Sequence, residues 1–250
     1  MPGPTAQPRE SLKARSTRAR PSGPRHKAGV TNRSMAVSDK LPTSAQQIFA
    51  RQSQCSAINC GMAGRIIVLN GVGSAGKTSA AKAFQKIAAD PFLHVSGDVF
   101  LDMIPPRLWG DPSGIVFRQF EADGRAAVEI EMGIALDRLM QGMRASVAAL
   151  ARAGNNCIVD DIMLSSSDRQ SYVEACRGLS LHFVAVHAPL AILEQRERDR
   201  GDRLIGISRW QFARVHKDID YDFEIDTLTQ TPKAVATAIA SALDVPLSRG

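Results

Sequence analysis

A short segment in the first third of the chain has residue types and spacing suited to binding phosphate. It consists of Gly71, Val72, Gly73, Ser74, Ala75, Gly76, Lys77 and Thr78, in the pattern G-x-x-x-x-G-K-T. The glycines let the backbone bend around an anion, so that backbone N–H groups point at nucleotide phosphates. Lys77 adds a positive charge, and the Thr78 hydroxyl can ligate Mg²⁺. The pattern predicts nucleotide binding with Mg²⁺; the alternative is a glycine-rich turn with an incidental lysine.

Three carboxylates follow predicted strands, where ligands bind in parallel sheets. Asp98 could orient an acceptor hydroxyl and take its proton, or it could cap a helix beginning at Val99. Asp160 follows an apolar strand and is a candidate second Mg²⁺ carboxylate. Asp161 could orient Lys77, the acceptor or nothing. For both residues, the alternative is a strand-end pair that balances the charge of the loop.

An alternating run of charges covers residues 196–203. Arg196, Arg200 and Arg203 would share one face of a helix, because they recur at spacings of four and three. Such a segment is either a solvated, salt-bridged surface or a lid whose arginines close over the triphosphate and stabilise the transferring phosphoryl group. The phosphate-binding pattern upstream favours the lid.

The remaining elements must position these groups. Apolar runs predict strands at 65–70, 92–95, 157–161, 181–187 and 223–226. Periodicity and breakers predict helices at 77–89, 99–104, 134–153, 168–177, 190–200, 209–216 and 231–243. Strands that alternate with helices indicate a single α/β domain, with a parallel sheet covered on both faces.

One segment interrupts this alternation. Residues 115–120 and 127–132 flank Asp123-Gly124, and apolar side chains alternate with glutamates in the second half. This is typical of a hairpin that turns at Asp-Gly. The hairpin is either an insertion at the acceptor site or a surface loop.

Composition separates a basic N-terminal tail, residues 1–61, from the domain at 62–250. The first 60 residues hold ten of the 31 Lys/Arg but two of the 25 Asp/Glu. The tail is expected to be disordered. It is a dispensable extension, with translation starting at Met35 or Met62, or else a targeting or anion-binding arm.

The domain itself is near neutral, which argues against a nucleic-acid-binding face. No apolar run approaches the ~20 residues of a membrane span, and four scattered cysteines fit a reducing compartment, so we expect a soluble cytoplasmic protein.

The chain resembles the chloramphenicol phosphotransferase family over about residues 64–245. The segments that carry the resemblance are 65–78, Gly97-Asp98 with the residues to Pro105, 158–161, 200–203, and 215–227. The resemblance implies a nucleoside-monophosphate-kinase-like fold with a five-stranded parallel sheet. It also implies transfer of the ATP γ-phosphate to a small-molecule hydroxyl with Mg²⁺; the antibiotic-modifying member acts on chloramphenicol.

The resemblance also implies roles: residues 71–78 would bind ATP, Asp98 would deprotonate the acceptor, and the arginine run would form the lid. Combined with the residue types, this makes Lys77, Asp98 and Arg200 the candidate catalytic residues and adds Arg196 and Arg203 to the ATP site. Thr78 and Asp160 are the candidates to hold Mg²⁺. The chain departs from the antibiotic-modifying member in its loop, which is not serine-rich and ends in Lys-Thr, and it matches weakly over residues 107–132.

Two other functions remain open. One is a nucleoside or polynucleotide kinase on the same fold. The other is a nucleotide-dependent interaction protein without catalysis, with the tail as its binding arm. The oligomeric state is left open.

Overall fold

The computed structural model describes residues 63–122, 124–201 and 204–248. By its internal contacts the chain divides into two units, residues 1–60 and 61–250, and every described residue belongs to the second. The expected disorder of the basic tail therefore lies outside the described residues. No helix in the described ranges is both long enough and apolar enough to cross a lipid bilayer.

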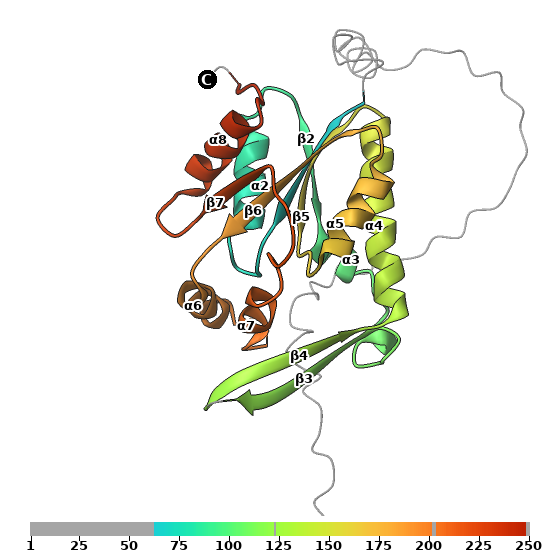
Figure 1. Cartoon of the computed structure of the whole chain (residues 1–250), viewed down its shortest axis with the longest axis vertical. Coiled ribbons are helices and arrows are strands. Elements are labelled where there is room, and N and C mark those ends of the chain that lie inside the picture. Colours follow the sequence, from blue (N-terminus) through green and yellow to red (C-terminus); the bar gives the residue numbers. More distant parts are fainter. Residues whose placement is uncertain (1–62, 123, 202–203, 249–250) are drawn as a thin grey trace, which may run out of the picture. The chain divides into compact units, whose positions relative to one another are not determined.

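A five-stranded parallel sheet forms the centre of the domain (Figure 1). Its strands, in spatial order, are β2 (Phe92–Ser96), β5 (Asn156–Asp161), β1 (Arg65–Asn70), β6 (Ser180–His187) and β7 (Phe223–Asp226). In register, Val68 of β1 lies between Val159 of β5 and Phe183 of β6. The sheet confirms the predicted α/β fold and its five parallel strands.

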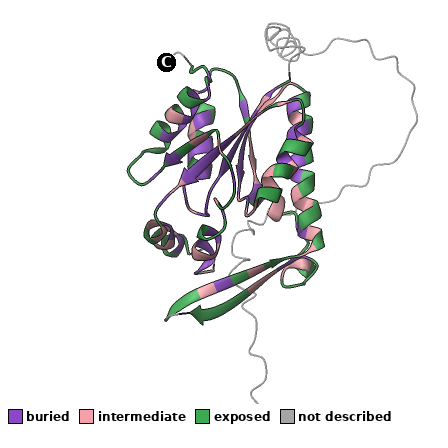
Figure 2. Ribbon diagram, in the orientation of Figure 1, coloured by how far each residue is buried: buried purple, intermediate pink, exposed green. Residues whose placement is uncertain are grey.

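Helices bury both faces of this sheet (Figures 1 and 2). α2 (Lys77–Ile87) and α8 (Pro232–Ala242) cover one face, and α4 (Ile134–Arg152) and α5 (Ser166–Ala175) cover the other. Because successive side chains of a strand point to opposite faces, Leu69 packs on the first side and Val68 on the second. The middles of the central strands, such as Ile66–Leu69 of β1 and Phe183–Val186 of β6, are apolar on both faces for that reason.

The remaining elements lie at the carboxyl edge of the sheet (Figure 1). They are α3 (Gly97–Leu101), the 3-10 turn η1 (Pro106–Leu108), the antiparallel pair β3 (Ile115–Ala122) and β4 (Arg125–Met132), and helices α6 (Leu190–Arg200) and α7 (Ile207–Phe212). A small apolar cluster of Ile104, Ile115 and Leu136 joins the hairpin to α4.

The hairpin is confirmed, including the position of its turn. Ala122 pairs with Arg125, so residues 123–124 connect the strands, and Gly124 has a φ of +68°. A positive φ favours glycine at this position of a tight turn.

Two short helices differ most from the prediction. α3 begins at Gly97 and ends at Leu101, where residues 99–104 were expected to be helical. α7 covers Ile207–Phe212 instead of residues 209–216. Its earlier start has a tertiary cause, because the buried Glu197 carboxylate accepts hydrogen bonds from the N–H groups of Gly206 and Ser208 at 2.9 and 2.7 Å. This cap comes from another helix and leaves no local signal in the sequence.

Candidate active site

The segment between β1 and α2 has the geometry of an anion-binding loop. Ser74 and Gly76 have positive φ angles of 67° and 97°, and α2 begins directly after Gly76. At Gly71, a Cβ would lie 2.4 Å from the Val186 carbonyl oxygen, so only glycine fits against β6. The loop thus turns its backbone toward the N-terminus of α2, where N–H groups and the helix dipole favour an anion.

Lys77 is buried at the base of this loop, with 5% of its surface exposed. Its Nζ donates hydrogen bonds to the carbonyl oxygens of Gly71 and Val72 at 2.7 and 3.0 Å. The Ser74 hydroxyl is also buried, and it has no hydrogen-bond partner among the described residues. A buried positive charge beside an unsatisfied hydroxyl fits a phosphate ligand well.

Two oxygen ligands meet next to the loop. The Thr78 hydroxyl, on the first turn of α2, donates to Asp160 Oδ2 at the end of β5, and His94 Nε2 lies 3.6 Å from the same oxygen. Burial raises the pKa of Asp160, but the His94 imidazole, the Lys77 charge and the Thr78 hydroxyl outweigh it and leave the pKa below its usual range. The carboxylate is therefore ionised at neutral pH.

This pair suits Mg²⁺, which prefers oxygen ligands and keeps several positions for water and phosphates. Within the described ranges no three His, Cys, Asp or Glu side chains are grouped to hold a metal ion. Thr78 and Asp160 would accordingly supply part of the shell, and the phosphates the rest.

Asp98 lies at the same edge of the sheet, on α3. It is exposed and is the second residue of the helix, so the predicted capping of a helix that begins at Val99 is wrong. The N-cap position belongs to Ser96, because the backbone turns helical already at Gly97. A carboxylate in the first turn still interacts favourably with the helix dipole. The position leaves the side chain at the surface.

Asp161 faces the other side of β5 from its neighbour. Its carboxylate accepts from the Ile162 N–H at 2.7 Å and from the Tyr172 hydroxyl at 2.9 Å. Burial raises the pKa of Asp161, and the Arg144 charge and these hydrogen bonds offset the increase only in part. A Cβ on Gly97 would lie 3.3 Å from Asp161 Oδ1, so this carboxylate packs against the start of α3. Asp161 therefore interacts with Arg144 of α4, Tyr172 of α5 and the start of α3.

One arginine of the run contacts the phosphate loop. Arg196 Nη1 donates to the Ser74 carbonyl oxygen at 3.2 Å, which connects α6 to the phosphate loop. Glu197 is 1% exposed and holds the start of α7. Arg200 is the last residue of α6 and is exposed, and Arg203 lies outside the described residues.

The structure adds loop contacts that the sequence did not suggest. Gln211 of α7 accepts from the Gly73 N–H at 2.8 Å, and the Thr227 hydroxyl donates to the Ala75 carbonyl oxygen at 2.8 Å. Asn70 is fully buried and donates to the Val215 carbonyl oxygen at 2.8 Å. These partners are more than 130 residues from the loop, so no local pattern could have revealed them.

A histidine pair lies beyond the loop. The rings of His187 and His216 are 4.2 Å apart, His187 Nε2 is 2.8 Å from Glu224, and His216 Nδ1 is 2.9 Å from the Tyr221 hydroxyl. Burial and then the neighbouring His187 lower the pKa of His216 to about 4. His216 is therefore neutral at physiological pH.

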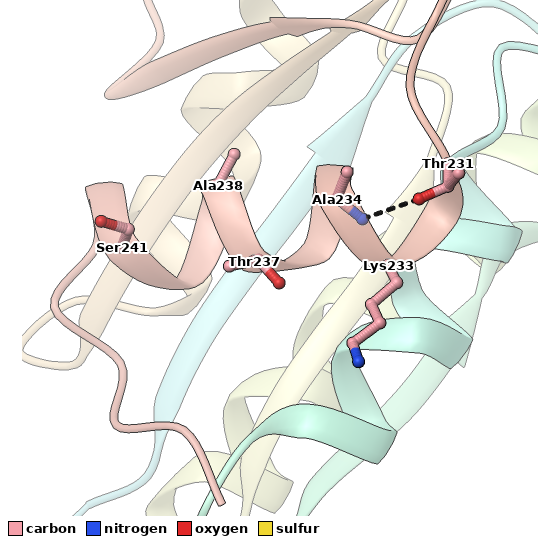
Figure 3. A pocket seen from close by; sticks show the side chains of 6 residues that line it. All are labelled: Thr231, Lys233, Ala234, Thr237, Ala238 and Ser241. Atoms are coloured by element: carbon pink, nitrogen blue, oxygen red, sulfur yellow. Dashed lines mark hydrogen bonds between the residues drawn. The ribbon is translucent and has the colours of Figure 1, made fainter.

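A shallow depression on the outer face of α8 is separate from this site (Figure 3). It is lined by Thr231, Lys233, Ala234, Thr237, Ala238 and Ser241. None of the predicted site residues lines it, and the groups that could do phosphate chemistry lie elsewhere.

Comparisons with known proteins agree with this geometry. A family model described as "Chloramphenicol phosphotransferase-like protein" matches residues 64–244. A Mycobacterium tuberculosis protein named "Putative O-phosphotransferase" is 36% identical over 178 residues, which cover 68% of this chain and 77% of that protein.

Solved kinases share the fold at low sequence identity. A sugar kinase from Janibacter sp. HTCC2649 superimposes with a TM-score of 0.55 at 19% identity, covering 73% of this chain and 95% of the kinase. The APS kinase CysC of Mycobacterium tuberculosis, in complex with AMPPNP and APS, superimposes with a TM-score of 0.53 at 14% identity, covering 74% and 99%. By its sequence, its fold and its phosphate loop, this chain is an enzyme of the small-molecule kinase class and belongs to the chloramphenicol phosphotransferase-like family.

Proposed function

We propose that this protein transfers the γ-phosphoryl group of ATP to a hydroxyl of a small molecule, with Mg²⁺. One observation carries the proposal. The strand order β2-β5-β1 brings Asp98, the Thr78–Asp160 pair and the phosphate loop to adjacent positions at one edge of the sheet. Phosphoryl transfer needs these three groups side by side, because its catalysis is positioning and charge stabilisation.

The loop and the lid would hold the nucleotide. Backbone N–H groups and Lys77 bind the phosphates, and Arg196 already reaches the loop from α6. Arg200 and Arg203 follow on the same segment and would stabilise negative charge on the transferring group.

Thr78 and Asp160 would hold Mg²⁺, which when bound neutralises charge on the β- and γ-phosphates. Asp160 is suited to this because its pKa lies below the usual range, so the carboxylate is available as a ligand without losing a proton.

Asp98 would accept the acceptor's proton. The acceptor oxygen forms its bond to phosphorus as the bond to the β-phosphate oxygen breaks. ADP leaves, and the hydroxyl proton passes to the Asp98 carboxylate and then to solvent. The exposed position of Asp98 lets an acceptor approach from solvent.

The family name makes chloramphenicol the first acceptor to test, among other hydroxylated small molecules. Dependence on ATP and two free cysteines, Cys157 and Cys176, fit a cytoplasmic enzyme.

The test is a screen for acceptor-dependent ADP release, with phosphorylated product identified by mass. Hydroxylated antibiotics, sugars and nucleosides form the panel, with a single-stranded oligonucleotide as a further arm. Phosphorylation of nucleosides alone would favour a nucleoside kinase. ATP binding without transfer to any acceptor would favour the non-catalytic alternative and count against this proposal.

A further inference from the structure

Helix α7 touches the phosphate loop at one end and the hairpin at the other. Near its C-terminal end, Gln211 is 7% exposed, and its Oε1 accepts the Gly73 N–H of the phosphate loop at 2.8 Å. Before its first residue, Gly206 has a φ of +104°, and a Cβ there would lie 2.9 Å from the Ala126 carbonyl oxygen of β4. One short helix therefore spans from the nucleotide loop to the hairpin.

The same helix is joined to the arginine segment. Glu197 of α6 holds the N–H groups of Gly206 and Ser208, while the adjacent Arg196 reaches the Ser74 carbonyl oxygen. The lid pair, α6 with α7, thus contacts two consecutive loop residues, Gly73 through its N–H and Ser74 through its C=O. The two contacts together fix how the lid sits on the loop.

The contact at Gly73 has a chemical consequence. Backbone N–H groups of such loops are the groups that bind phosphates, so the loop's conformation decides nucleotide affinity. A buried N–H that loses its acceptor is costly, and the loop would relax to avoid that cost. Gln211 therefore holds the loop in one conformation before any nucleotide arrives.

We propose that Gln211 is a positioning residue that preorganises the phosphate loop and transmits nucleotide binding from Gly73 to the surroundings of α7. This inference rests on the proposed function for the identity of the nucleotide. In this role Gln211 keeps its hydrogen bond to Gly73 in the bound state, so that Arg196 and Arg200 approach the terminal phosphates in a fixed orientation.

The affinity test compares two matched variants. Gln211→Met keeps the length of the side chain and removes the acceptor. Gln195→Met makes the same change at an exposed position of α6, where the side chain donates to Asp199 and accepts from Arg198, both of the same helix. Calorimetry with Mg·AMPPNP should show about a tenfold loss of affinity for the first variant and none for the second. Unchanged or tighter binding by Gln211→Met would overturn the proposal. It would mean that the Gly73 N–H does not need Gln211 in the bound state, as when a phosphate oxygen takes the place of the glutamine.

The coupling can be observed with the chain's own tryptophans, Trp109 and Trp210. Trp210 precedes Gln211 on α7, so a Trp109→Phe chain reports α7 alone. Its fluorescence should change in a saturable way with AMPPNP, and adding Gln211→Met should remove most of that change at saturating nucleotide. A silent Trp210 in the chain with Gln211 intact would overturn the coupling. This measurement decides even if Gln211→Met does not fold.

Failure of this inference is distinguishable from failure of the proposed function. If the unmodified protein does not bind AMPPNP, the proposed function is at fault. If the unmodified protein binds AMPPNP and Gln211→Met binds it equally well, only the positioning role of Gln211 is lost.

Discussion

The phosphate loop and Asp98 lie at one edge of the sheet, but they are held by different means. The loop follows the buried strand β1, and its backbone is held by its own Lys77, by Gln211 of α7 and by Thr227, which follows β7. Asp98 is exposed on a helix of five residues. One region is buried and connected to distant segments, and the other lies at the surface.

Under the proposed function, the difference follows from what each region would bind. A nucleotide phosphate needs a fixed set of N–H groups, and buried, cross-connected backbone supplies them. An acceptor must enter from solvent and leave after reaction, which a short exposed helix beside a hairpin permits. Substitutions on the nucleotide side should accordingly affect every acceptor alike, whereas those on the acceptor side should leave nucleotide binding intact.

The largest effect is expected at Lys77. Lys77→Ala removes the buried charge beside the phosphates and should lower phosphoryl transfer by about 10³-fold or more. Lys82→Ala, on the exposed face of the same helix α2, is the control. The rate of acceptor-dependent ADP release measures both, and equal rates for the two variants would contradict the assignment of Lys77.

Asp98→Asn tests the acceptor side. It should reduce kcat by about 10²-fold while leaving Mg·AMPPNP affinity unchanged, because the amide cannot take the proton. Asp102→Asn, one turn later and also exposed, should behave like the parent. Full activity in Asp98→Asn would remove its role as a base.

Asp160→Asn should act on the metal requirement. Removing one negative oxygen ligand should raise the Mg²⁺ concentration for half-maximal activity by about tenfold, with a smaller change in kcat at saturating Mg²⁺. A Mg²⁺ titration of the transfer rate measures this shift. A parallel loss of kcat without any change in the Mg²⁺ midpoint would indicate a role other than metal binding.

The smallest effect concerns stability and pH. The pKa of His216 is about 4 in the folded chain, whereas an unfolded chain should have the ordinary value of about 6.5. As pH falls, the unfolded chain therefore binds a proton at this imidazole before the folded chain does. Stability from the neutral imidazole is therefore complete above pH 6.5 and is lost progressively down to about pH 4. Since the ring is partly exposed, we expect a difference of only about 1 kcal/mol. Urea unfolding at pH 7.5 and 5.0 should show a smaller pH dependence in His216→Gln than in the parent.

Much of the fold followed from local pattern, because its strands are apolar runs and its helices are periodic. The strands at 65–70 and 223–226 and the helix at 190–200 have the predicted bounds. The start of α7 did not follow, since its cap is Glu197 in a different helix. Gly71 to Thr78 could be recognised because the chemistry resides in consecutive residues. Gln211 and Asn70 could not, because each acts through a contact with a distant segment.

The base of the hairpin carries one further consequence. The Gly133 N–H donates to the Gly114 carbonyl oxygen at 2.7 Å, so the points where residues 115–132 leave and rejoin the domain coincide. Lengthening, trimming or exchanging such a segment costs little loop-closure entropy and does not disturb the sheet register. Under the proposed function, residues 115–132 can in this way change as one unit during evolution, while the phosphate loop stays the same.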